Sequence, residues 1–357
     1  MKMLDEVHGK KQNVCNLCYR GAAKALSLDS VVYTPSGKTT IGAVRTGDTI
    51  LGEDGKPAVI THKSKVFNKP MYRLLLEDGR YLKVSEDHIN TVIHRRGARK
   101  GGMTGKGNTR KVVTTYERRD LTTKQLLSYN LTASRKATTK NPKGRENMLW
   151  IPLGKPAQFE EAHVDVDPYV MGMLLGDGSI TKDSGYSRLH CHKDDLENYK
   201  NLIPYVTGKE YIKDNTITVG ILGIGKYMKK YGVNVHGDYK FVPSVYKYGS
   251  VEQRLSILKG LMDTDGTITK NGTPSFTSNS KQLCDDVAEL VRSLGGIAKV
   301  VESGEGYKYF QTNIQANFSM FNLNRKKSRE NTKSKNKVAI LSLERIEEEP
   351  CQCISID

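Results

Sequence analysis

Several features are scarce in this sequence, and each scarcity excludes a class of protein. The 357 residues include only six cysteines, too few for a disulfide scaffold, which favours a reducing compartment. No apolar run approaches the length of a membrane-spanning helix, so we expect no membrane partner. The first residues, MKMLDEVHGKKQNVC, contain no apolar signal segment, and we therefore expect a protein that is not secreted.

Acidic residues are also in deficit, with 39 Asp and Glu against 56 Lys and Arg and a formal net charge of +17. This excess favours a polyanionic partner, and nucleic acid is the first choice. Hydrophobic residues make up 37% of the chain, which is enough for ordinary cores. The length predicts two or more domains.

Two segments resemble each other, VMGMLLGDGSI (170–180) and LKGLMDTDGTI (258–268), at a spacing of 88 residues. Each is an apolar run with small residues that ends in Asp-Gly. This pattern predicts two helices that pack closely and stop at glycine, with Asp177 and Asp265 together at their ends. Paired carboxylates can hold divalent metal ions between two phosphodiester bonds. A single Asp-Gly is typical of a turn, but two within matching apolar runs are not explained that way.

The paired segments resemble the motifs of the LAGLIDADG homing endonucleases. The resemblance implies a pseudo-twofold domain with an αββαββα half-repeat over 151–324, in which Asp177 and Asp265 coordinate Mg²⁺. The family also carries a Lys-x-x-Pro element whose lysine assists at the metal-bound water. Lys240 and Pro243 match this element in KFVPSVY. A surface lysine is the alternative at Lys240.

From Ala25 onward, short β-rich runs (31–34, 49–51 and 58–61) alternate with glycine-containing turns, and residues 71–93 predict a hairpin. This is the pattern of an all-β module. Its residues resemble an intein: the 29–48 segment is similar to the first splicing block and Ser85-Glu86-Asp87-His88 to the second. The resemblance implies that Ser85 and His88 act on the amide before residue 25. The family carries Cys or Ser at this position, so Ala25 implies an engineered knock-out or an alanine-type intein.

The last residues, KVAILSLERIEEEPCQCISID, are similar to the penultimate intein block, with Cys353 near the splice centre. A final strand ending in His-Asn is absent, so we expect impaired splicing and an open sheet edge near Cys353 that accepts a complementary C-terminal peptide. The expected fold is α+β, a discontinuous all-β Hint horseshoe (25–150 and 338–357) plus the endonuclease domain. We expect a basic linker at 325–337.

Residues 1–24 end in CNLCYRGAAK. Cys15 and Cys18 have zinc-ligand spacing but no second pair nearby. Arg20 to Lys24 resemble a degenerate phosphate-binding loop, so this segment is either a surface loop or the remnant of an interrupted, phage-terminase-like ATPase. The implied location is the cytoplasm of a bacterial or phage-infected cell.

Several segments are predicted to contact DNA. Residues 94–145 contain 15 Lys and Arg and predict a flexible basic arm with a short helix at 120–131, or a merely solvated loop. Two alternating strands are predicted to present polar side chains on one face. The predicted DNA contacts are Arg95, Arg96, Arg99 and Lys100 in the arm, Arg188, His190 and His192 on one strand, and Tyr307, Tyr309, Gln311, Asn313 and Gln315 on the other.

These resemblances together imply a monomeric, metal-dependent endonuclease that cuts both strands of a long DNA site, carried in a splicing-deficient intein. Three alternatives remain from the sequence. They are a DNA-binding module without nuclease activity, the N-terminal part of a split intein, and a host ATPase.

Overall fold

The structure is a computed structural model that describes residues 25–100, 103–104, 107–108, 111–134, 144–180, 187–205, 207–304, 309–334 and 336–357. The chain divides into two units, each described below by itself. One contains Thr34–Gly37 and Lys155–Ser334, and the other contains Lys38–Gly154 and Lys335–Asp357 together with the first described strand, β1 (Ala25–Ser27). The second unit is therefore discontinuous in sequence.

Within Lys155–Ser334, an order of helix, two strands, helix, two strands and helix occurs twice. The first series is α2 (Pro168–Gly176), β15 (Gly178–Ile180), β16 (Ser187–His192), α3 (Leu196–Leu202), β17 (Thr207–Lys213), β18 (Thr216–Ile221) and α4 (Gly225–Lys230). After α5 (Ser244–Lys247), the second is α6 (Val251–Asp265), β19 (Gly266–Ile268), β20 (Pro274–Ser278), α7 (Lys281–Ser293), β21 (Ile297–Ser303), β22 (Tyr309–Gln315) and α8 (Asn324–Lys327). The two sheets, β15-β16-β18-β17 and β19-β20-β22-β21, have the same strand order.

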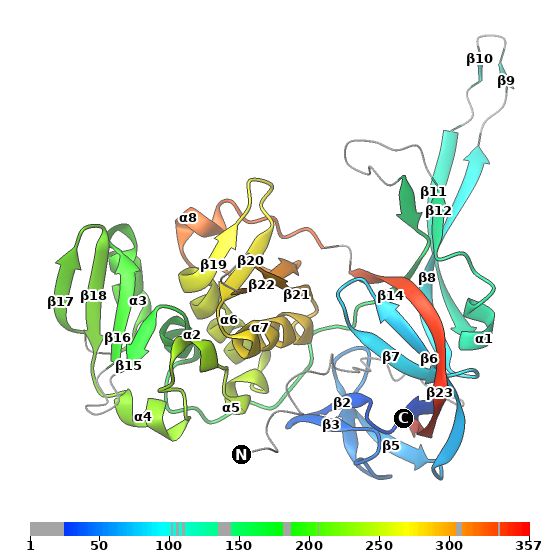
Figure 1. Cartoon of the computed structure of the whole chain (residues 1–357), viewed down its shortest axis with the longest axis horizontal. Helices are drawn as coiled ribbons and strands as arrows, with labels where there is room; N and C mark the ends of the chain where they lie inside the picture. Colours follow the sequence, from blue (N-terminus) through cyan, green and yellow to red (C-terminus); the bar gives the residue numbers. More distant parts are fainter. Residues whose placement is uncertain are drawn as a thin grey trace. The chain divides into compact units, whose positions relative to one another are not determined.

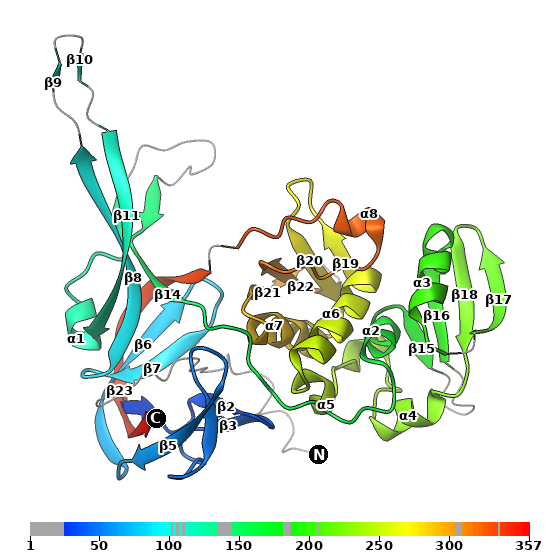
Figure 2. The ribbon, with the colours of Figure 1, turned by 180° about the vertical axis from the view of Figure 1, so that it is seen from behind.

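The helices α2 and α6 lie side by side in the middle of this unit, between the two sheets (Figures 1 and 2). Their first turns are set by local sequence: Asp167 caps α2 ahead of Pro168, and Ser250 forms a capping box with Gln253 in α6. Both helices contribute to one hydrophobic core, which also contains residues of α3 and α7. The acidic ends of α2 and α6 are therefore carried on buried, well-anchored elements.

The other unit is mostly β-structure, and its largest sheet contains the path β1-β7-β6-β23-β14-β8-β11. The long strand β23 (Lys337–Ile356) runs through it and pairs with strands from the first part of the chain. The remaining elements are β2 (Val31–Thr34), β3 (Gly37–Thr40), β4 (Thr49–Leu51), β5 (Pro57–Lys63), β6 (Phe67–Leu76), β7 (Tyr81–Ser85), β8 (Ile89–Lys100), β9 (Met103–Thr104), β10 (Gly107–Asn108), β11 (Lys111–Thr122), α1 (Thr123–Leu126), β12 (Thr132–Ser134), β13 (Arg145–Asn147) and β14 (Leu149–Pro152).

The predicted short strands and the 71–93 hairpin are present, but the predicted flexible basic arm is wrong over much of its length. Strands β8 and β11 pair along twelve residues each, from Ile89↔Thr122 to Lys100↔Lys111. Val, Ile, Thr and Tyr residues occur across the two strands and support this hairpin, because such residues favour strands. The predicted helix at 120–131 is shorter than expected, since α1 comprises only Thr123–Leu126 with Thr122 and Gln125 as its capping box.

Two further expectations need correction. The predicted basic linker does not begin at residue 325, because Arg325 and Lys326 belong to α8 and Lys326 is buried. The sheet edge is not open at Cys353, because Cys353 pairs with Ala25 on one side. On the other side, the carbonyl oxygen of Cys353 accepts the backbone N–H of Ser64 at 3.0 Å. The backbone N–H of Cys353 donates to the hydroxyl oxygen of Ser64, also at 3.0 Å.

Residues 1–24 lie outside the described residues, so the predictions for Cys15, Cys18 and the phosphate-loop-like segment stay predictions. Across the described part of the chain, no helix combines the length and apolar character needed to cross a membrane.

Candidate functional site

The helices α2 and α6 approach so closely that two glycines are required at their contact. A Cβ added to Gly172 would lie 2.9 Å from the backbone nitrogen of Leu261, and one added to Gly260 would lie 2.9 Å from that of Met173. Both distances are shorter than a carbon atom tolerates against backbone, so only glycine fits. The sequence prediction of closely packed helices therefore has a direct steric basis.

This packing brings the ends of the two helices together. Asp177 is the residue that ends α2, and Asp265 is the last residue of α6. A Cβ on Gly176 would lie 3.4 Å from Oδ2 of Asp265, so the Asp265 carboxylate lies against the last residue of α2. Asp177 is exposed and Asp265 is half-buried.

The glycine after each Asp serves a different purpose from the expected left-handed helix stop. Gly266 has φ −76°, and Gly178 is not among the residues with positive φ. Instead, the chain turns back over the preceding helix: a Cβ on Gly178 would lie 2.5 Å from Cα of Leu174, and one on Gly266 would lie 2.7 Å from Cα of Met262. These glycines let each motif pass directly into a strand, β15 or β19.

A lysine ammonium caps each of the two helix ends. Lys240 Nζ donates to the carbonyl oxygens of Gly176 at 2.6 Å and Gly178 at 3.2 Å. Lys326 Nζ donates to those of Thr264 at 3.1 Å and Gly266 at 2.7 Å, which are the positions equivalent to Gly176 and Gly178. A cation is favourable at a helix C-terminus, where carbonyl groups lack helical partners.

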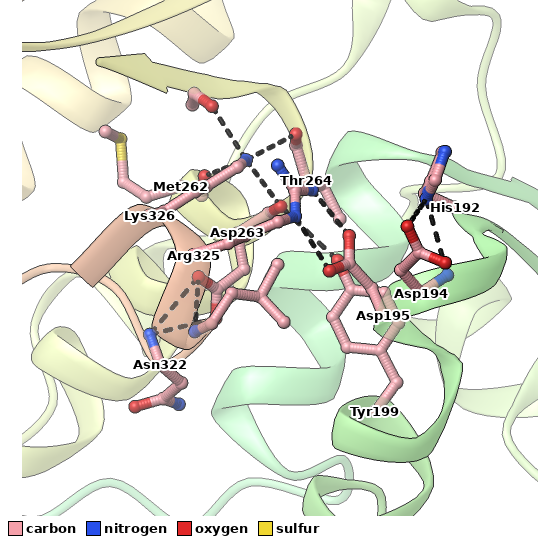
Figure 3. A network of polar contacts seen from close by, with 12 residues as sticks. His192, Asp194, Asp195, Tyr199, Met262, Asp263, Thr264, Asn322, Arg325 and Lys326 are labelled. Carbon is pink, nitrogen blue, oxygen red and sulfur yellow. Dashed lines mark hydrogen bonds and ion pairs between the residues drawn. The ribbon is translucent and has the colours of Figure 1, made fainter. Parts of the chain in front are cut away.

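Sequence reasoning identified Lys240 but missed Lys326, which it assigned to the basic linker. The missed signal is the separation of the two lysines, since Lys326 lies 86 residues after Lys240 while the motifs repeat every 88 residues. Lys326 also donates to the carbonyl oxygens of Met262 at 3.0 Å and Asp263 at 2.6 Å (Figure 3).

The electrostatics of the cluster shift each of its four charged groups toward its neutral form. Desolvation, followed by the charge of Asp177, raises the pKa of Asp265 to about 7, although Lys240 and Lys326 oppose the shift. Desolvation also raises the pKa of Asp177, and its exposed position argues for a smaller shift there. The pKa of Lys240 is lowered by desolvation, and that of Lys326 is lowered to about 8 by desolvation and by Arg325.

The donor chemistry of the two helix ends fits a hard divalent cation. Two neighbouring carboxylates with raised pKa values would be stabilised in their ionised forms by such an ion, and oxygen ligands suit Mg²⁺. The described residues contain no group of three or more His, Cys, Asp and Glu side chains that could hold a metal ion by themselves. Water or a phosphate oxygen of the substrate would therefore have to complete the ligand set.

The predicted DNA-contacting strand of the first sheet is β16. Its burial alternates so that Arg188, His190 and His192 share the less buried face. His190 lies close to the helix ends, because its N–H donates to the Asp177 carbonyl oxygen at 3.2 Å. Its ring nitrogens contact Ser179 at 3.3 Å and Thr218 at 2.9 Å, so it is held within the sheet.

The second predicted strand is β22, which presents Tyr309, Gln311, Asn313 and Gln315 along one face, while Tyr307 lies outside the described residues. Neighbouring strands add polar side chains that the sequence analysis did not single out. Gln311 donates to Ser275 at 3.3 Å, Ser275 contacts Thr267 at 2.9 Å, and Lys299 pairs with Asn313 in register. Thr267, Lys299 and Asn313 are exposed on this sheet, whereas Ser275 is buried.

The four predicted arm residues lie on β8. Arg95 makes an ion pair with Glu146, and Arg96 pairs with Glu117 at 3.1 Å. The side chains of Arg99 and Lys100 lie outside the described residues. The paired state of Arg95 and Arg96 reduces the positive charge that this part of the hairpin offers to a phosphate.

The residues predicted for splicing gather around β1. Ala25 is 2% exposed and lies directly across from Cys353, in a small apolar cluster with Met71 and Cys351. Leu26 pairs with Val84, so Ser85 lies beside the start of β1, and its buried hydroxyl has no hydrogen-bond partner among the described residues. His88 is buried and its N–H donates to the Ser85 carbonyl oxygen at 3.1 Å.

Comparison with known proteins gives partial matches. Residues 252–347 match the family described as LAGLIDADG-like domain. Over 277 residues the chain is 27% identical to the replicative DNA helicase DnaB of Mycobacterium intracellulare, covering 77% of this chain and 43% of that protein. The chain thus spans less than half the length of this relative. The relative is a helicase, so the predicted terminase-like host stays a prediction.

Solved structures resemble the chain more weakly. A mesophilic variant of the homing endonuclease I-DmoI matches with a TM-score of 0.32 and 13% identity over 42% of this chain and 87% of that chain. The MchDnaB-1 intein matches with a TM-score of 0.19 and 25% identity over 27% of this chain and 84% of that chain. The similarity to a LAGLIDADG-like domain therefore rests on residues 252–347, which contain α6 from its second residue onward, the second motif and α8.

Proposed function

We propose that the chain is a site-specific DNA endonuclease of the LAGLIDADG type, inserted in an intein, that hydrolyses both strands of a long site with Mg²⁺. The observation that carries the proposal is the pair of acidic helix ends. Asp177 and Asp265 end two helices that glycines hold in contact, and a lysine caps each end. The match of residues 252–347 to the LAGLIDADG-like family supports the same reading.

The roles of the four groups follow from their chemistry. Asp177 and Asp265 would hold the metal ions, which when bound neutralise phosphate charge and lower the pKa of a coordinated water molecule. Lys240 and Lys326 would stabilise negative charge that develops on the phosphate as the bond to the leaving oxygen breaks. Because their pKa values are lowered, each ammonium also releases a proton more readily than that of an exposed lysine.

The same site would read DNA through the two sheets as halves of a pseudo-twofold domain. Arg188, His190 and His192 on β16, and Gln311 and Asn313 on β22, offer donors and acceptors for base edges and phosphates. The net charge of +17 supports a polyanionic substrate. We propose that the active form is a monomer, since one chain carries both motifs, and that it acts in the cytoplasm.

The discontinuous β-unit favours a second role as a splicing element of the Hint type, with a horseshoe-shaped fold. Ala25 supplies no nucleophile. The residue that pairs with it in the neighbouring strand is Cys353, which carries a thiol. Splicing in this chain would therefore be impaired at its first acyl shift. A complementary C-terminal peptide would have to pair at a position other than Cys353, where Ala25 and Ser64 close the sheet edge.

The test of the nuclease proposal is cleavage of an unbiased substrate. A randomised double-stranded DNA library is incubated with the protein and Mg²⁺, and cut molecules are sequenced. We expect one long consensus cut on both strands, and no cutting with EDTA. Binding that enriches a sequence without any cut strand in Mg²⁺ or Mn²⁺ would favour a DNA-binding module instead.

A further inference from the structure

Asp263, two residues before Asp265, is a buried carboxylate with three hydrogen-bond donors around it. It is 1% exposed. Its oxygens accept the Tyr169 hydroxyl at 2.8 Å and the backbone N–H group of Leu323 at 3.2 Å. They also accept the backbone N–H group of Asn322 at 3.1 Å (Figure 3). The equivalent residue of the first motif is the buried, apolar Leu175. Because burying a carboxylate is costly, its presence in only one motif needs a reason.

The two backbone amides that Asp263 binds begin the segment that carries Lys326. The Leu323 carbonyl oxygen accepts the N–H of Lys326 at 3.0 Å, which closes the first turn of α8. Lys326 Nζ then reaches back to the end of α6, where it donates to the Asp263 carbonyl oxygen at 2.6 Å. Asp263 thus holds this segment at two points: its carboxylate binds the backbone amides that begin the segment, and its carbonyl oxygen accepts from the Lys326 ammonium.

A second buried carboxylate stands in the same relation to Lys240. Asp286 on α7 is 1% exposed, and its Oδ2 accepts the N–H of Val242, two residues after Lys240, at 2.8 Å. The hydroxyl of Ser280, which caps α7, donates to the Lys240 carbonyl oxygen at 2.6 Å. Each lysine therefore lies within four residues of a backbone amide that a buried carboxylate binds.

We propose that Asp263 is the positioning residue for Lys326, and that Asp286 has the same role for Lys240. Each carboxylate fixes the backbone of the segment that carries its lysine, and so holds the ammonium at the end of α6 or α2. The proposal rests on the proposed nuclease function. Neither carboxylate needs to touch DNA or metal, because each acts through its lysine.

The first test uses the free protein without metal or DNA. Lysines are acetylated with acetic anhydride, and the rate at each lysine is measured by mass spectrometry. We expect Lys326, which is 8% exposed, to react about tenfold faster in Asp263→Leu than in wild type, because its segment is released locally. Asp263→Asn, which keeps one acceptor oxygen, should give a smaller increase. Lys247, 9% exposed and bonded to Asp286, is the internal reference and should not change.

Two outcomes would overturn the positioning role. One is equal protection of Lys326 in wild type and both Asp263 variants. The other is a similar rise at Lys326 and Lys247, which would mean that Asp263 supports the whole core rather than this segment.

The second test uses a duplex that the wild type cuts, with a different label on each strand. Asp263→Asn should slow cleavage about tenfold at unchanged DNA affinity. The ratio of the cleavage rates of the two strands should be the same in Asp263→Asn as in Lys326→Met. Likewise, Asp286→Asn should show the same ratio of strand cleavage rates as Lys240→Met. Wild-type rates in Asp263→Asn would contradict the positioning role. If the wild type cuts no DNA, the nuclease proposal fails, while the acetylation test still decides whether Asp263 positions Lys326.

Discussion

Gly172 of α2 and Gly260 of α6 face each other, and a Cβ on either one would lie within 3.1 Å of the Cα of the other. This contact sets the distance between the two helices and therefore brings Asp177 and Asp265, five residues beyond each glycine, to one place. Packing and chemistry are coupled at this point, because widening the helix contact would separate the acidic ends.

Gly172→Ala should destabilise the Lys155–Ser334 unit, because the new methyl group meets the backbone of α6. We expect a loss of about 2 kcal/mol or more in the free energy of unfolding, as overpacked cores show. Gly237→Ala is the matched control, since a Cβ there meets nothing within 4 Å. Thermal unfolding of both variants measures the effect, and equal melting temperatures would contradict the contact.

The raised pKa of Asp265 makes the stability of the metal-free protein depend on pH. The folded value of about 7 exceeds the usual 3.8, so the folded state binds this proton more tightly than the unfolded state. Stability should therefore fall as pH rises from about 4 to about 7 and then level off. Each pKa unit is about 1.4 kcal/mol, so ionisation costs the folded state on the order of a few kcal/mol.

Asp265→Asn removes this cost and should raise the melting temperature in EDTA at pH 8 more than at pH 5. Adding Mg²⁺ at pH 8 should stabilise the wild type more than the variant. An equal gain at both pH values would show that Asp265 does not titrate in this range.

The β8–β11 hairpin should contribute affinity for DNA without sequence preference. Replacing Arg95, Arg96, Arg99 and Lys100 with Ala should weaken binding to all duplexes alike and reduce the dependence of Kd on salt concentration. Because Arg95 pairs with Glu146, the comparison needs a control in which Glu146→Gln breaks that ion pair alone. Loss of discrimination between sites at unchanged non-specific affinity would identify the hairpin as a base reader.

The purified chain should stay at full length under reducing conditions, since Ala25 has no thiol or hydroxyl group. A peptide that supplies a final strand, His-Asn and a nucleophile should permit cleavage at the C-terminal junction, and Ala25→Cys should then permit ligation. Mass spectrometry of the products measures both reactions, with Cys353→Ser as the control for the thiol opposite residue 25. Ligation by the unchanged chain would mean that Ala25 is native, and no reaction in either variant would contradict a split intein.

Sequence patterns predicted the features that depend on neighbouring residues. The apolar runs ending in Asp-Gly and the capping residues Asp167 and Ser250 specify α2 and α6 locally. The polar alternation on β22 is likewise a local signal. These elements therefore have the boundaries and faces that the spacing predicts, within a few residues.

The missed features depend on contacts between distant residues. Lys326 looks like part of a basic linker because RKKSR has the composition of one, whereas its ammonium is bound by carbonyl groups of α6, over 60 residues away. The β8–β11 hairpin was missed because Gly and basic residues mask a strand pattern that only its pairing partner stabilises. The closed edge at Cys353 depends on Ser64 and Ala25, which lie 289 and 328 residues earlier.

The central claim is that Asp177 and Asp265 together form the nuclease centre, and separating binding from cleavage tests it most directly. On a duplex recovered from the cleavage library, wild type, Asp177→Asn and Asp265→Asn are compared for Kd with Ca²⁺ and for cleavage of each strand with Mg²⁺. The account predicts that both variants bind within a few-fold of wild type and lose cleavage by at least about a thousandfold. Cleavage of both strands at near wild-type rates by either variant would contradict it.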